Sequence, residues 1–149
     1  MYRSLLTSVT EQRRRFGSEP QPPCTEIQIA QLTDGVAKQL AAQLPAGYID
    51  FLRLGNGLDW NGLVIFASER VAIASHPDRF IAGFVEMNLV FREADTSRSL
   101  IFGSDGMDVY TYDQSTGIYE IRDEVSRDVI DSLHSFDAMM VKALTRCLQ

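Results

Sequence analysis

The sequence predicts an α+β fold, a single domain in which helices flank one antiparallel β-sheet. The chain has 149 residues, the size of one compact domain. Helical and strand-like apolar patterns both occur, but without the regular strand–helix alternation that builds a parallel sheet. An Asn-Gly pair at 61–62 joins two apolar runs, which is the strongest short signal for a hairpin of antiparallel strands. We expect residues 1–24 to form an N-terminal helix and connector, and residues 25–149 to form the main domain.

The N-terminal part predicts a short amphipathic helix followed by an extended segment. Apolar residues and Arg13 recur at helical spacing between Leu6 and Phe16. Three prolines at positions 20–23 then force the chain to be extended. The arginines follow the apolar residues instead of preceding them, so we do not expect a signal peptide.

Two helices are predicted next. A Thr-x-x-Gln capping box at 25–28 opens the first, and its apolar residues recur at every third or fourth position up to Leu44. Pro45 ends this pattern and is well placed to open a second helix over Ala46–Leu54. An Asn-Gly turn at 56–57 follows.

The rest of the chain mixes strands and helices. After the hairpin at 61–62 we expect a strand at 71–73, and then a helix that starts near Phe80 because aromatic and apolar residues recur from there to Phe91. Three strands are predicted at 100–102, 107–112 and 118–122. Ser135 is the expected N-cap of a final helix.

Charge is distributed unevenly. The formal net charge of the chain is −6, which disfavours general nucleic-acid binding. Residues 99–137 contain nine acidic residues and two arginines, a net charge of −7. A well-solvated surface accounts for many such runs. The alternative is a face that attracts a basic partner.

No catalytic or metal-binding motif emerges. The Gly-Ser-Asp-Gly turn at 103–106 lacks the Walker lysine, and the nearby aspartates do not have the spacing of a calcium loop. His76, at the expected helix start, and His134 are interpreted as capping or surface residues. Cys147 is expected in the core and Cys24 as a free thiol. We therefore predict no enzyme activity, no metal and no cofactor, and the absence of disulfide or membrane-spanning patterns favours the cytoplasm.

Trp60 is the single tryptophan of the chain and stands beside Asp59 at the predicted hairpin tip. Tryptophan is enriched among the residues that dominate binding energy at interfaces, so Trp60 is a candidate anchor. The alternative is that its ring folds back onto the core.

Three stretches of the chain form a pattern when they are taken together. The first is Leu-Pro-Ala-Gly-Tyr-Ile-Asp-Phe-Leu-Arg-Leu-Gly-Asn-Gly at 44–57. The second is Phe-Gly-Ser-Asp-Gly at 102–106 with the strand and turn at 109–119, and the third is Leu-His-Ser-Phe-Asp at 133–137. In this order the three stretches resemble the SUKH superfamily, most closely its YrhA-like branch. Residues 1–24 lie outside the resemblance.

The resemblance implies an α+β fold and an immunity protein, one that binds and neutralises a cognate antibacterial toxin of a contact-dependent or polymorphic system. Many such toxins are nucleases, whose basic surfaces suit an acidic inhibitor. The alternative is a regulatory adaptor of the same fold without a toxin partner. We expect no direct contact with nucleic acid or membrane. The predicted toxin-binding residues are Asp59, Trp60, Asp105, Asp108, Asp113, Glu120, Asp123 and Glu124.

Overall fold

The computed structural model describes residues 1–94 and 98–149, and within them the chain forms five helices and eight strands. The helices are α1 (Tyr2–Arg15), α2 (Glu26–Leu40), α3 (Ala46–Leu54), α4 (Phe84–Ala94) and α5 (Phe136–Leu148). The strands are β1 (Leu58–Trp60), β2 (Leu63–Ile65), β3 (Val71–Ile73), β4 (His76–Ile81), β5 (Leu100–Ser104), β6 (Asp108–Asp113), β7 (Ile118–Asp123) and β8 (Val129–Leu133).

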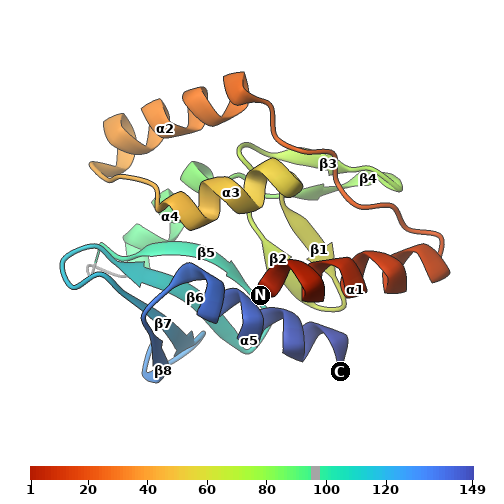
Figure 1. Cartoon of the computed structure of the whole chain (residues 1–149). Helices are drawn as coiled ribbons and strands as arrows, with labels where there is room; N and C mark the ends of the chain where they lie inside the picture. Colours follow the sequence, from red (N-terminus) through yellow and green to blue (C-terminus); the bar gives the residue numbers. More distant parts are fainter. Residues whose placement is uncertain (95–97) are drawn as a thin grey trace.

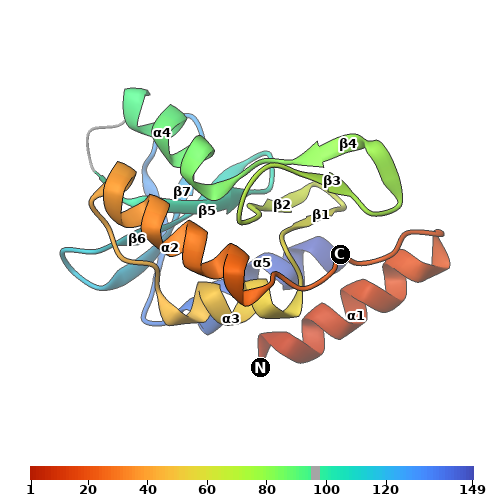
Figure 2. The same ribbon diagram turned by 90° about the horizontal axis from the view of Figure 1, so that it is seen from above.

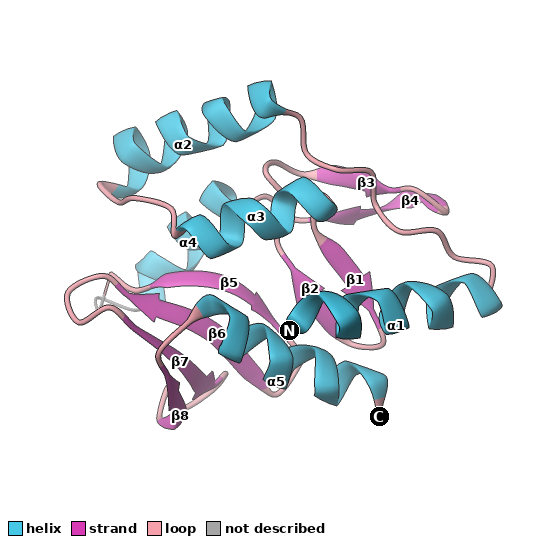
Figure 3. Ribbon diagram, viewed as in Figure 1, coloured by secondary structure: helices cyan, strands magenta, loops and turns pink. Residues whose placement is uncertain are grey.

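Six strands build one antiparallel sheet in the order β1-β2-β5-β6-β7-β8, while β3 and β4 form a separate two-stranded sheet (Figures 1 and 3). This arrangement confirms the predicted α+β class. The helix α5 packs against the six-stranded sheet, and α1 lies along α5 (Figures 1 and 2). The helices α2 and α4 pack against each other, and α4 also contacts β5.

Aromatic rings fill the space between the sheet and the helices. The ring of Phe102 in β5 is surrounded by three other rings. Its centroid lies 5.1 Å from that of Tyr48, 5.4 Å from that of Phe136 and 5.9 Å from that of Phe84. Tyr48 is fully buried, and its hydroxyl donates a hydrogen bond to the carbonyl oxygen of Phe66 at 2.7 Å. The polar end of this ring is therefore satisfied inside the core.

The hairpin between β1 and β2 is confirmed. Asn61 and Gly62 have φ angles of 51° and 88°, so both turn residues lie in the left-handed region that the sequence signal requires. Gly103 on the adjacent β5 is also structural, because a Cβ atom there would lie 2.0 Å from the carbonyl oxygen of Val64. Only glycine lets β2 and β5 approach this closely.

The capping box of α2 is confirmed, since the side chains of Thr25 and Gln28 each accept a backbone N–H of the other residue. This helix ends earlier than predicted, at Leu40. Ala41 adopts a left-handed conformation, and the Arg92 guanidinium donates to the Leu40 carbonyl oxygen at 2.9 Å. The capping group thus comes from α4, and Leu44 lies buried outside the helix.

The predicted start of α4 near Phe80 is wrong. His76 to Ile81 instead form β4, and the helix begins at Phe84. Phe80 is exposed and its ring is covered by the guanidinium of Arg70 at 4.1 Å. His76 is accordingly an exposed strand residue and not a helix cap.

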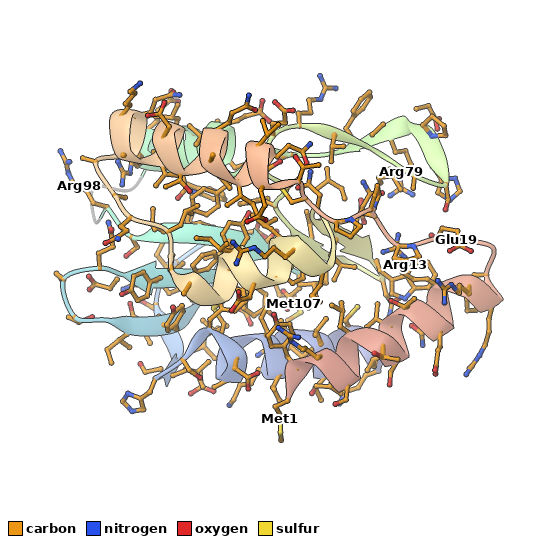
Figure 4. The ribbon with its side chains drawn as sticks, turned by 45° about the horizontal axis from the view of Figure 1, so that its top comes forward. Met1, Arg13, Glu19, Arg79, Arg98 and Met107 are labelled. Carbon is orange, nitrogen blue, oxygen red and sulfur yellow. The ribbon has the colours of Figure 1, made fainter. Side chains whose placement is uncertain are left out.

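The N-terminal helix belongs to the folded unit. Val9 is fully buried against the core, and Arg13 is 1% exposed. Arg13 lies on the side of α1 that faces the connector, where it donates to the Glu19 carbonyl oxygen at 2.9 Å (Figure 4). The extended connector then passes β3, because the Gln21 side chain bonds to the backbone of Ala72 and Ala74.

Candidate protein-binding site at the turn end of the sheet

Three turns meet at one end of the six-stranded sheet, which we call the turn end. They are the β1–β2 turn at 61–62, the β5–β6 turn at 105–107 and the β7–β8 turn at 124–128. The Glu124 N–H donates to the Met107 carbonyl oxygen at 2.9 Å, and the Asn61 side chain donates to the Cys147 carbonyl oxygen at 2.6 Å. The turn end therefore lies beside the C-terminal half of α5, as Figure 1 shows.

Asp105 organises the β5–β6 turn. One carboxylate oxygen accepts the backbone N–H groups of Met107 and Asp108, and the other accepts the Tyr110 hydroxyl at 2.7 Å and Arg146 Nη1 at 3.2 Å. Burial on its own raises the pKa of the Asp105 carboxyl, but these hydrogen bonds outweigh burial and hold that pKa below its ordinary value. Asp105 is therefore ionised at neutral pH.

Arg146 of α5 bridges two carboxylates. Its Nη1 atom lies 2.7 Å from Asp108 Oδ2 as well as 3.2 Å from Asp105 Oδ2. The hydrogen bond to Asp108 is the main reason that the pKa of Arg146 is raised. Asp108 is one of the predicted toxin-binding acids, a role that requires an exposed side chain, but it is only 6% exposed. The side chain points toward α5 and helps to fix that helix to the sheet.

A cleft of about 420 Å³ opens beside this bridge. Its apolar walls are the side chains of Leu63, Met107, Ala143 and Cys147. Its polar lining consists of Asn61, Asp105, Asp108 and Arg146. The cleft thus combines a mostly apolar wall with two carboxylates that share one guanidinium.

Two large apolar side chains stand exposed at the turn end. Met107 is 75% exposed and Val125 is 93% exposed. Asp123, Glu124 and Asp128 surround Val125 in the sequence and carry negative charge. An apolar centre with a charged margin is the usual composition of a protein-binding surface.

The predicted residues Asp123 and Glu124 lie at the turn end, but Asp113 and Glu120 do not. Asp113 sits at the opposite end of β6, where it accepts the Ser115 N–H. Glu120 pairs with Thr111 in the sheet register and forms an ion pair with Arg122 at 2.8 Å. Strand alternation puts Thr111 on the opposite face from Asp108, so Glu120 cannot join the cleft.

Trp60 and Asp59 lie next to the cleft, and their side chains contact other side chains of this chain. The Trp60 indole N–H donates to the Gln12 side chain at 2.8 Å, and its ring lies 6.0 Å from that of Phe16. Asp59 forms an ion pair with Arg79 at 3.4 Å. The indole is partly buried under α1, which favours the interpretation of Trp60 as a packing residue.

Sequence reasoning missed Arg146, Met107 and Val125. Arg146 lies 38 positions from Asp108, so nothing local in the sequence connects them. For Met107 and Val125 a signal existed, because each is an apolar residue directly next to an acid, Asp108 and Glu124 respectively. The exposure of these two side chains follows from the positions of the turns in the structure, which the sequence pattern does not give.

The two cysteines are buried and the two histidines lie at the surface. Burial raises the pKa of the Cys24 thiol, and it raises that of Cys147 to about 11. Both histidines are exposed. Among the described residues, no group of three or more His, Cys, Asp or Glu side chains is placed to hold a metal ion.

Comparisons with known proteins add no relative: no protein-family model matches the chain, and neither does any curated protein. In residues 1–94 and 98–149, no helix has the length and apolar character needed to span a membrane. The interpretation of the site therefore rests on its geometry.

Proposed function

We propose that this chain is an immunity protein that binds a cognate antibacterial toxin in the cytoplasm and blocks it stoichiometrically. The observation that carries the proposal is the turn end, where exposed Met107 and Val125 stand among acidic residues beside a large cleft. Such a surface fits a protein partner with a basic, partly apolar face. No chemical step is needed, because covering the toxin's active site is sufficient.

The charge favours a nuclease as the toxin. Enzymes that cleave nucleic acids hold an anionic backbone and carry basic residues near the active site. The segment 99–137 has a net charge of −7, and several of its acids gather at the turn end. Opposite charges speed the encounter of two proteins and set their orientation.

The resemblance to the SUKH superfamily supports the same proposal. The residues that carry it have structural roles: Tyr48, Phe51 and Leu52 are buried, and the Asn56 side chain forms hydrogen bonds with Ser68. Since these residues hold the fold, partner recognition has to use other positions. The turn end supplies such positions.

Rescue of cells is the decisive experiment. The proposal predicts that a toxin gene lies directly upstream of this gene; that toxin is expressed with and without the protein, and growth is measured. We expect the wild type to restore growth, and Met107→Lys combined with Val125→Lys to lose this protection. Ile27→Lys is the matched control, because Ile27 is 72% exposed on α2, away from the turn end. Failure of the folded wild type to rescue growth would remove the proposal.

A further inference from the structure

The cleft at the turn end has a charge imbalance. Asp105 and Asp108 contribute two negative charges, and Arg146 contributes the single positive charge that balances one of them. Two acids nearby, Asp123 opposite Asp108 in the sheet register and Glu124 beside Met107, add to the excess. A bound cation would make the cleft itself neutral.

Asp108 offers the atom that such a cation needs. Its Oδ2 atom accepts Arg146, whereas its Oδ1 atom accepts no hydrogen bond from any described residue. The residue is 6% exposed and lines the cleft, so water reaches its carboxylate chiefly from that side. A charged donor that enters the cleft can replace this water and form a charge-assisted hydrogen bond with Asp108.

The walls of the cleft suit a long aliphatic stem. Leu63, Ala143 and Cys147 form an apolar surface, and the flexible thioether of Met107 stands at the rim, where it can pack on an entering side chain. Arginine and lysine both have an apolar stem and a charged head, and they bury the stem where apolar surface is available.

We propose that the cleft is the receptor for one arginine side chain of the basic partner, with its guanidinium on Asp108 and its stem against Leu63 and Ala143. This inference rests on the proposed function and specifies how the partner is held. Arginine fits better than lysine because its guanidinium is planar and more weakly hydrated, and because it donates to two carboxylates at once.

The test uses n-butylguanidinium, which reproduces the arginine side chain and needs no toxin. Full-length protein labelled at the methionine methyl carbon and at the aspartate carboxyl carbon is titrated and observed by NMR. We expect saturable shifts of the Met107 methyl and the Asp108 carboxyl signals. Neutral n-butylurea should produce neither shift, and n-butylammonium should bind more weakly.

Asp108→Asn should weaken n-butylguanidinium binding by about tenfold or more, whereas Asp123→Asn should leave it within about twofold. If Asp108→Asn does not fold, the Asp108 carboxyl signal of the wild type provides the same information. Absence of saturable shifts in the wild type overturns the proposal, and equal binding of n-butylammonium overturns the choice of arginine. If n-butylguanidinium binds but the protein does not rescue growth, the cation site stands and the proposed immunity function is wrong.

Discussion

The Asn88 side chain pairs with the backbone of Ile101 as a neighbouring strand would. Its amide group donates to the Ile101 carbonyl oxygen at 2.9 Å, and its own oxygen accepts the Ile101 N–H at 2.9 Å. Asn88 is 1% exposed, so no water can take over these bonds. The short strand β2 pairs with β5 only at Gly103 and Ser104, and α4 supplies the missing partner through one side chain.

We predict that Asn88→Ala lowers the free energy of unfolding by about 2–4 kcal/mol, because two buried backbone groups of Ile101 lose their partner. Urea denaturation followed by circular dichroism measures the change. Gln31→Ala, at an exposed position of α2, is the control and should stay within about 0.5 kcal/mol of the wild type. Equal stability of the two variants would contradict the role assigned to Asn88.

Asp105 should make stability depend on pH in the acidic range. The pKa of its carboxyl is lowered in the folded protein, so the folded state holds its proton less tightly than the unfolded chain, where the pKa is about 3.9. The stabilisation is therefore complete above about pH 5 and is lost as the pH falls through the folded-state pKa.

Asp105→Asn isolates this contribution, because the amide oxygen can still accept the N–H groups of Met107 and Asp108. We expect the difference in unfolding free energy between wild type and variant to stay constant above about pH 5 and to shrink as the pH falls from there to pH 2. Denaturation curves across this range measure it. A difference that does not change with pH would contradict the assignment.

The elements that the sequence predicted correctly are those with strong local signals. The capping box at Thr25 and the turn at Asn61 depend only on neighbouring residues, and both are confirmed. The start of α4 was misjudged because Phe80 has helical spacing to Phe84, although Phe80 belongs to a strand that pairs with β3. The strand β8 was not predicted, since its residues alternate weakly and pairing with β7 holds it in place.

Only part of the candidate site was predicted, because its acids are visible in the sequence and their tertiary partners are not. Composition located the acids of residues 99–137, but it could not show which of them serve the fold. Asp108 and Glu120 both look like exposed strand acids in the sequence, whereas the first holds Arg146 and the second pairs with Arg122. Their partners come from tertiary contacts and sheet geometry, which spacing along the chain does not reveal.

The two cysteines should be unreactive until the protein unfolds. Both thiols are buried, and burial raises the pKa of Cys147 to about 11. The thiolate is the reactive form, so an aromatic disulfide reagent at pH 8 should react roughly 100-fold more slowly with native protein than with urea-unfolded protein. In urea each protein molecule should release two equivalents of the reagent's aromatic thiol, one for each cysteine. Rapid reaction of either cysteine in the native protein would contradict their burial.

Glu124 and Asp128 are acids of the β7–β8 turn, and we call them the rim pair. They should control how fast the toxin associates. Reversing Asp105 or Asp108 would also break the contacts to Arg146 that fix α5, so a charge-reversal experiment has to use other acids. Glu124 and Asp128 form no side-chain hydrogen bond within the described residues, so reversing them leaves the network around Asp105 and Arg146 intact.

We therefore predict that Glu124→Lys combined with Asp128→Lys slows association with the cognate toxin about tenfold at low salt. The association rate of this variant should also depend less on salt concentration. Glu69→Lys with Glu86→Lys is the matched control, because both residues are exposed, lie near α2 and α4 and change the net charge equally. Stopped-flow association rates at several salt concentrations separate the two pairs. Equal slowing by both pairs would mean that net charge alone steers the encounter, whereas slowing by the rim pair alone places the basic face of the toxin at the turn end.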